Sequence, residues 1–428
     1  MTIRRLTHTL ILAAGCVSLV LLSACSSAPG AAASTRASGR SNYAFWPLFP
    51  DEPRVQFLRS LGGSADLAKA ESSALENIVF GKEVEKDAMI SKPYGLAMRD
   101  GRVYVCDMRA GSLVVFDLRK KQTRLLGTSG ANRLGHPVAV AVADDGRIYV
   151  AESERGAIVV FDATERYSHS MGLPKFKPAS LAVHGNRLYA SDMLAQAVQV
   201  FDCATGKHVG TIGSVGDNDG QFRLPLGVAT DKVGNVFVID MMRGRLQKFS
   251  PDGQFLAGTG VIGDSAGAFA RPKHIAVDSD GIIYVVDASF QNVQMFDDQL
   301  RMLMHFGAAG NFPGSMNLPA GICVDDATIA LFRDELHEGF EGKRVIAVTN
   351  QFGDAKVSLY ALGQKREGYA AADFARVATK VSQGVGATEE TLMMQETVPG
   401  GTPLEDVEAS DTPTEPAPTP TPPAVTPK

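Results

Sequence analysis

The sequence predicts an all-β fold built from six copies of one four-stranded unit. A proline that precedes a small residue and an apolar run recurs at spacings of 44, 41, 47, 47 and 47 residues. About eleven residues after each of the first five prolines, an aromatic and apolar stretch ends in a polar residue, as in Tyr104–Asp107. Between the two stretches lies an Asp-Gly or Gly-Asn turn, which reverses a chain between antiparallel strands. The prolines are Pro93, Pro137, Pro178, Pro225, Pro272 and Pro319.

Each unit continues with a third strand, such as Leu246–Phe249, and a more variable fourth one. The apolar runs are β-branched and only four or five residues long, which excludes a helical repeat. Four short antiparallel strands at a period of about 40–50 residues are typical of a β-propeller blade. One such sheet leaves both of its faces uncovered, whereas six sheets packed radially cover one another. We therefore predict a six-bladed β-propeller over residues 46–363.

The sixth unit has three recognisable strands, at 320–324, 344–350 and 357–360, and no clear fourth strand. Residues 54–61 (RVQFLRSL) resemble the fourth strands of the other units. We predict that this N-terminal strand completes the last blade, because closure removes an exposed sheet edge. The alternative is a free extended arm. Two insertions interrupt the repeat, at residues 64–90 and 327–342.

The chain begins with features of an exported protein. A positively charged start, MTIRR, precedes an apolar run at residues 10–22 that is too short to span a bilayer comfortably. Residues 22–25, Leu-Ser-Ala-Cys, resemble the lipobox of bacterial lipoproteins. The resemblance implies that residues 1–24 are a lipoprotein signal peptide and that Cys25 carries the lipid that binds the membrane. Ser26 then favours the outer membrane, in either leaflet. The alternative is an ordinary signal peptide that is cut nearby.

The regions that flank the propeller differ from it in composition. Residues 25–45 are rich in Ser, Ala and Gly, which predicts a flexible tether after the lipidated cysteine. A short helix is expected within residues 364–385. Residues 386–428 are acidic and rich in Pro and Thr, which predicts a disordered, extended tail. Residues 25–386 hold 39 basic and 39 acidic side chains, so the core lacks the basic balance of a nucleic-acid-binding domain.

The unit around Pro225 carries the most explicit motif. Its segments GSVGDNDGQFRLPLGVATD (213–231), GNVFVID (234–240) and RLQKF (245–249) resemble the NHL repeat, whose family forms six-bladed propellers. The resemblance covers about residues 88–363. Two units depart from it, because Glu152 replaces the usual Asp and the glycine-rich loop before Pro178 is missing.

A narrower resemblance rests on the second insertion and on WPLFPDEP (46–53) and VTNQF (348–352). These segments are similar to a group of bacterial NHL lipoproteins often encoded beside multihaem c-type cytochromes. The resemblance implies an envelope protein partner, with a multihaem cytochrome as one candidate.

Candidate binding residues lie in the loops that lead into each first strand and in the turns that join second and third strands. A propeller places both sets on one face around the channel. These loops are rich in basic residues, so we expect a mouth that attracts an anionic ligand or an acidic partner. The alternative is that the side chains are solvated and pair locally. The candidates are His274, Lys273, Arg271, His136, Arg155, Arg243 and Arg245.

Among these, His274 is the most distinctive, because other units have a small residue at its position. A histidine there could project into the channel as a ligand or an acid-base group, although a lone histidine is more often structural.

A second set of side chains ends the second strand of each unit. Six oxygen donors around an axis would suit a hard cation. In the repeat family, however, this position caps the following turn, and we favour that structural role. No other cofactor is expected. The set consists of Asp107, Glu152, Asp192, Asp240, Asp287 and Asn350.

Three functions remain open at this point. The sequence contains no nucleophile elbow, zinc-binding His-Glu-x-x-His helix or phosphate-binding loop, so we favour a membrane-anchored, noncatalytic binding or scaffold protein of the cell envelope. One alternative is a lyase-type or lactonase-type enzyme with a channel metal, as in similar propellers. The other is an accessory subunit of an envelope electron-transfer complex. The fold alone does not decide among them.

Overall fold

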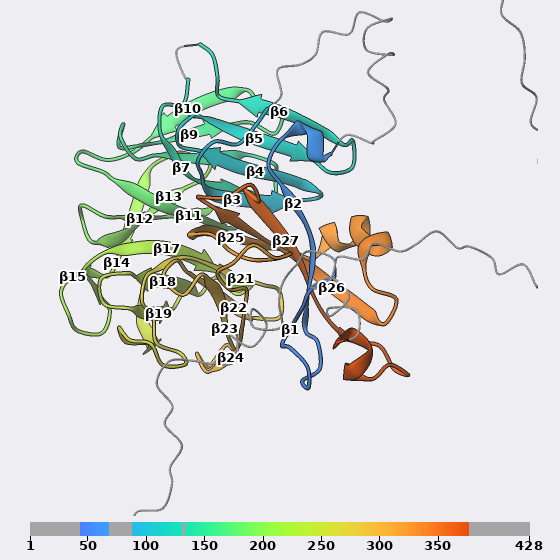
Figure 1. Cartoon of the computed structure of the whole chain (residues 1–428). Helices are drawn as coiled ribbons and strands as arrows, with labels where there is room; N and C mark the ends of the chain where they lie inside the picture. Colours follow the sequence, from blue (N-terminus) through green and yellow to red (C-terminus); the bar gives the residue numbers. More distant parts are fainter. Residues whose placement is uncertain (1–42, 68–87, 131–132, 376–428) are drawn as a thin grey trace, which may run out of the picture. The chain divides into compact units, whose positions relative to one another are not determined.

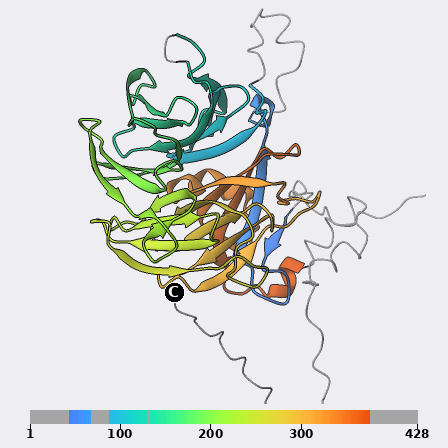
Figure 2. The same ribbon diagram turned by 90° about the vertical axis from the view of Figure 1, so that its left-hand side faces the viewer.

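A computed structural model describes residues 43–67, 88–130 and 133–375 (Figures 1 and 2). All three ranges belong to the larger of the two compact units of the chain, Arg40–Lys428. The predicted signal peptide, Cys25, most of the tether and the tail at 386–428 lie outside the described residues. Within the three ranges, no helix has the length and apolarity needed to cross a bilayer.

Six antiparallel sheets form the blades. Blade one comprises β3 (Pro93–Arg99), β4 (Arg102–Asp107), β5 (Ser112–Asp117) and β6 (Gln122–Leu126); blade two comprises β7 (Pro137–Val142), β8 (Ile148–Glu152), β9 (Ala157–Phe161) and β10 (Tyr167–Met171). Blade three comprises β11 (Pro178–His184), β12 (Arg187–Asp192), β13 (Ala197–Asp202) and β14 (His208–Ile212); blade four comprises β17 (Pro225–Thr230), β18 (Val236–Asp240), β19 (Arg245–Phe249) and β20 (Phe255–Thr259). Blade five comprises β21 (Pro272–Val277), β22 (Ile283–Asp287), β23 (Asn292–Phe296) and β24 (Met302–Phe306). A small parallel pair, β15 (Ser214–Val215) and β16 (Gln221–Phe222), precedes blade four.

Blade six is assembled from both ends of the described chain. Its sheet runs β25 (Pro319–Asp325), β26 (Phe340–Asn350), β27 (Val357–Lys365), β2 (Val55–Leu61) and β1 (Phe45–Trp46). In Figure 1 the blue β2 lies beside the orange-red β27. The pairing of Val55 with Leu362 and of Leu61 with Val357 confirms the predicted closing strand. The fifth strand, β1, was not predicted.

The innermost strands pack against one another in sequence order, and β25 returns to β3. This ring confirms the predicted six-bladed β-propeller. Side chains alternate across each strand, so one strand contributes to two neighbouring junctions. In β4, for example, Val103 and Val105 face blade six, whereas Tyr104 and Cys106 face blade two. The described residues accordingly form six apolar clusters, one at each junction.

The second insertion holds the closing strand in place. It contains a 3-10 helix, η2 (Ala327–Glu335), between β25 and β26. The Glu335 carboxylate accepts hydrogen bonds from the Arg59 guanidinium, and Gln56 bonds the backbone of Glu335 and His337 at 2.9 and 3.0 Å. A second 3-10 turn, η1 (Ser64–Asp66), follows β2. These contacts link β2 to a segment almost 280 residues away.

The region predicted to hold a short helix, 364–385, begins as strand, since β27 continues to Lys365. Residues 371–375 are helical, and residues 376–385 lie outside the described ranges. The Phe374 ring packs edge-on against Phe45, with ring centroids 5.0 Å apart. The C-terminal segment thus covers the outermost strand of blade six.

Candidate functional site

The side chains that end each second strand organise one face of the propeller. The buried Asp287 carboxylate accepts four backbone N–H groups at 2.8–3.2 Å, two from the loop before β21 and two from the turn after β22. Asp107 makes the same four contacts in blade one. We call the face that carries these loops and turns the mouth face. Each carboxylate therefore joins the loop that enters its blade to the turn that follows its second strand.

The other members of the set also hold their own loops. Asp192, Asp240 and Glu152 accept N–H groups of the loop that leads into their blade, and the Asn350 amide bonds Asn317 and Ala355. All six residues are buried. In the part of the chain that the structure describes, no three His, Cys, Asp or Glu side chains are placed to hold a metal ion. Through these hydrogen bonds each of the six side chains holds the loop of its own blade, and we call the six residues the loop clips.

His274 lies inside the channel. It is 8% exposed, and its Nε2 is 3.2 Å from the Ser180 hydroxyl oxygen, which also accepts the Val228 N–H at 3.2 Å. Ser180 belongs to blade three and His274 to blade five, so the ring reaches past blade four. A Cβ on Gly227 would lie only 3.0 Å from the His274 backbone, which explains why a small residue occupies the position beside it. The buried ring thus connects blade five with blade three.

Burial lowers the pKa of His274 to about 4. The ring is therefore neutral at physiological pH. The backbone of Ile322 opposes this shift, although no hydrogen bond of ordinary geometry reaches Nδ1 from the described residues. The ring is neutral, buried and hydrogen-bonded to a serine of another blade. We call this ring the channel plug.

Lys273 is the centre of a cationic cluster above this plug. Its ammonium group donates a hydrogen bond to Gln351 Oε1 at 3.0 Å and lies 5.8 Å from the centre of the Tyr94 ring. Burial, together with the charges of Arg271 and Lys92, lowers the pKa of Lys273 to about 8. None of the three cations has an ion-pair partner among the described residues. Three basic side chains therefore share the channel mouth without an ion pair to an acidic side chain of the described residues.

The remaining predicted residues pair locally. His136 Nδ1 lies 3.7 Å from the Glu154 carboxylate, and Arg155 lies 4.0 Å from Glu152. Arg243 and Arg245 form ion pairs with two aspartates of the loop before β17, Asp217 at 3.7 Å and Asp219 at 2.8 Å. The structure thus brings Lys273 together with Arg271 and His274, and it leaves the other four predicted residues in separate surface pairs.

Exposed apolar side chains also lie on the mouth face. Leu194, Met242 and Phe352 are 59%, 58% and 62% exposed, and each lies in the turn after a second strand. Val261 and Ile262, in the loop before β21, are 64% and 63% exposed. Exposed apolar groups that gather on one face beside charged residues are typical of interaction surfaces.

Three residues of this site were missed from the sequence: Tyr94, Ser180 and Gln351. A signal was available for two of them, because Tyr94 directly follows a repeat proline, as Lys273 does, and Ser180 occupies the same repeat position as His274. Four of the six residues that follow the repeat prolines are small or aliphatic, so Tyr94 and Lys273 are the exceptions. Gln351 lies in a turn of variable sequence and gave no such signal.

The comparisons with known proteins agree with this fold. The described residues define a six-bladed β-propeller, and the family model of the NHL repeat matches residues 134–161. The match falls on blade two, one of the two units that depart from the repeat pattern, rather than on the unit around Pro225. No curated protein sequence matches the chain.

Several solved structures share the architecture. A structural genomics protein of unknown function from Bacteroides thetaiotaomicron is 16% identical, with a TM-score of 0.50 over 72% of this chain and 75% of that one. A gluconolactonase from Xanthomonas campestris is 13% identical, with a TM-score of 0.47 over 76% and 99%. Virginiamycin B lyase from Staphylococcus aureus is 10% identical, with a TM-score of 0.45 over 64% and 95%. At these identities the likeness concerns the fold alone.

Proposed function

We propose that the protein is a noncatalytic binding propeller of the bacterial cell envelope, tethered to the outer membrane through lipid on Cys25. Its mouth face binds an acidic segment of an envelope protein partner. The observation that carries the proposal is the cluster of Lys273, Arg271 and Lys92, three cations without acidic partners in the described structure. Leu194 and Met242 offer apolar contacts on the same face.

The charge of the site determines which ligand it suits. Bringing Lys273 out of water beside two other cations disfavours its charged form, as its lowered pKa indicates. A carboxylate that enters the mouth would compensate this charge and form charge-assisted hydrogen bonds. The plug at His274 keeps the ligand at the mouth. An acidic segment with apolar neighbours therefore fits both features of the face.

A binding titration tests the mouth face. A fluorescein-labelled peptide of glutamate and leucine should bind the protein, and binding should weaken as salt rises. The variants Lys273→Met and Arg271→Gln should each weaken binding about tenfold. The matched control is Lys232→Met, which removes an exposed lysine from the opposite face. Equal binding of a lysine and leucine peptide, or an equal loss in the control, would contradict the proposal.

Membrane attachment is tested separately. The variant Cys25→Ser should leave a soluble, unlipidated precursor, because an acyl anchor is what would hold the domain at a bilayer. Partitioning into detergent, measured by phase separation, should fall from nearly complete to background. A variant that still partitions with the membrane fraction would remove the anchor from the proposal and leave the mouth face untouched.

The partner can be sought among the proteins named by the narrower resemblance. If the protein is an accessory subunit of an electron-transfer complex, purification from membranes should recover a haem protein, visible by its Soret absorbance. Recovery should depend on Lys273 and Arg271 and survive Lys232→Met. Purified protein without haem would argue against this form of the proposal.

A further inference from the structure

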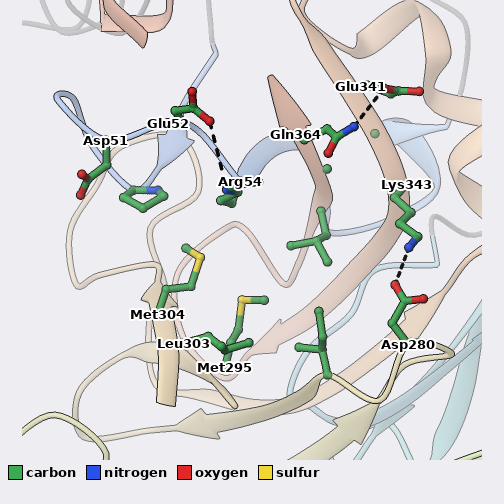
Figure 3. A pocket seen from close by; sticks show the side chains of 15 residues that line it. Asp51, Glu52, Arg54, Asp280, Met295, Leu303, Met304, Glu341, Lys343 and Gln364 are labelled. Atoms are coloured by element: carbon green, nitrogen blue, oxygen red, sulfur yellow. Dashed lines mark hydrogen bonds and ion pairs between the residues drawn. The ribbon is translucent and has the colours of Figure 1, made fainter. Parts of the chain in front are cut away.

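A large groove lies on the face opposite the mouth, between blades five and six. Its volume is about 1100 Å³, near the upper end for small-molecule sites. One wall is the loop between β1 and β2, and the other is the start of β26 with the end of β27. Blade five supplies the floor through β23 and β24. Figure 3 shows the groove with its lining side chains.

The groove exists because blade six departs from the regular blade. Strands β26 and β27 are eleven and nine residues long, whereas the second and third strands of the other blades have five or six. Gly342 and Gly363 are paired where the two extended strands run antiparallel, and no side chain fits there, since a Cβ on Gly363 would lie 2.0 Å from the Glu341 carbonyl oxygen. The loop at residues 47–54 adds a second wall that the five continuous blades lack. Both walls are therefore specific to this blade.

The floor is apolar and open to solvent. Leu303, at the second position of β24, is 51% exposed, and the partly buried Met304 and Ile282 lie beside it. Met295 and Leu362 complete the floor from below. Thioether side chains adapt to ligands of varied shape, because they are unbranched and polarizable. A hydrocarbon or aromatic body could therefore replace water over these five side chains.

The rim carries more acids than bases. Lys343 pairs with Asp280, whereas Glu52 pairs with two cations, Arg54 at 3.8 Å and Lys365 at 3.5 Å. Asp51 has no ion-pair partner among the described residues. Figure 3 shows Asp51 on the side of the groove opposite the Lys343–Asp280 pair.

Glu341 is the second rim acid without a cation. Within the ranges that the structure describes, its carboxylate accepts one hydrogen bond, a long one of 3.4 Å from the Gln364 amide, and has no ion-pair partner. Two acids thus remain uncompensated beside an apolar floor, whereas both bases of the groove are already paired. A positively charged group is the complement of this rim.

We propose that the groove binds an amphiphilic organic cation, with its apolar body on the methionine floor and its ammonium or guanidinium group beside Asp51. This site is separate from the mouth face and does not depend on the function proposed for it. Apolar burial supplies the affinity, and the rim selects the sign of the head group.

Methionine methyl NMR of the full-length chain in detergent-free buffer tests the site. The probe is decyltrimethylammonium below its micelle concentration. It should shift the Met295 and Met304 signals saturably, whereas decyl sulfate should bind about tenfold more weakly. Asp51→Asn should reduce the affinity for the cation about threefold and raise the affinity for decyl sulfate, because it removes the negative charge that repels the sulfate.

A matched pair of leucines locates the binding. Leu303 and Leu256 are both second in a fourth strand and both 51% exposed, but only Leu303 lines the groove. Leu303→Lys should reduce affinity about tenfold, and Leu256→Lys should leave it unchanged. Absent or unsaturable methyl shifts, equal binding of the two detergents, or an equal loss in both variants would overturn the proposal.

Discussion

Blades one to five each come from one continuous segment of the chain, whereas blade six combines two distant segments, although all six bury their sheet faces in the same ring. A continuous blade folds from neighbouring hairpins, and its fourth strand follows its third within a few residues. Blade six takes its outer strands from residues 45–61 and its inner strands from residues 319–365. Closing so long a loop costs chain entropy that a local hairpin does not incur. The last blade therefore needs contacts beyond the apolar layers that serve the others.

Those additional contacts are polar and buried. At the junction of blades three and four, two neutral hydrogen bonds accompany the apolar cluster. The Ser191 hydroxyl donates to the Leu226 carbonyl at 2.8 Å, and the Val228 N–H donates to the Ser180 hydroxyl at 3.2 Å. At the junction of blades five and six, the fully buried Arg344 pairs with Asp278. Lys273 crosses the same junction to Gln351. The comparison thus places a fully buried ion pair and a buried lysine at the junction of blades five and six.

The largest expected effect comes from removing the closing strands. Deleting residues 43–61 exposes the edge of β27 and removes the buried Val55 and Leu61, each worth about 1.5–3 kcal/mol by burial alone. That loss is comparable to the whole stability of a typical domain. We expect no cooperative unfolding transition in calorimetry, and partial recovery on adding a peptide of residues 43–61. A truncated protein that melts like the parent would show that closure does not depend on β2.

The second prediction compares the loss of stability when a buried ion pair, Arg344–Asp278, is broken with the loss when an exposed ion pair is broken. Arg344→Leu leaves the Asp278 carboxylate buried without its cation and should cost about 3–5 kcal/mol in urea unfolding. Arg102 pairs with Asp117 at 3.4 Å but is 41% exposed, so Arg102→Leu should cost less than about 1 kcal/mol. Adding Asp278→Asn to Arg344→Leu should recover part of the loss. An equal loss of unfolding free energy in Arg344→Leu and Arg102→Leu would contradict the claim that the buried ion pair matters more than the exposed one.

A smaller difference in stability is expected between variants of two of the loop clips, Asp287 and Glu152. Asp287 accepts four backbone N–H groups, whereas Glu152 accepts those of Gly135 and His136 only. Residues 270, 271 and 289 are exposed, so water can replace part of what the backbone N–H groups lose, and each lost hydrogen bond should cost about 0.5–1.5 kcal/mol net. Asp287→Ala should therefore destabilise the protein by more than Glu152→Ala, and hydrogen exchange should quicken at Ser289 and Phe290. A larger loss for Glu152→Ala would show that the number of contacts does not set the cost.

The repeat allowed most of the fold to be predicted. Proline spacing, strand length and Asp-Gly turns gave six blades, because each is a local consequence of hairpin geometry. The closing strand was also predicted, since residues 54–61 have the pattern of a fourth strand. Strand β1 was missed because two residues, Phe45 and Trp46, carry no periodic signal.

The candidate site was harder to predict, because its residues meet only in the closed ring. Lys273, Gln351 and Tyr94 come from blades five, six and one, and no spacing in the sequence places them together. His274 could be singled out by its repeat position, but its bond to Ser180 across the channel could not. The groove depends on the extended ends of the paired strands β26 and β27 and on the loop at residues 47–54, which lie far apart in the sequence and share no local pattern.

The smallest expected effect is a pH dependence of the folding stability, caused by Lys273 at the junction of blades five and six. The pKa of Lys273 is about 8 in the folded protein and about 10.4 in an unfolded chain. Between these values the unfolded state binds the extra proton, so the contribution of this lysine to folding stability rises with pH. Below pH 8 both states are protonated, and the lysine charge remains a cost to the folded protein. Lys273→Met should therefore stabilise the protein more at pH 7 than at pH 10, measured by urea unfolding, and Lys232→Met should show no such difference. A stability gain for Lys273→Met that does not change between these pH values would mean that the cluster at the closing blade is not the source of the lowered pKa.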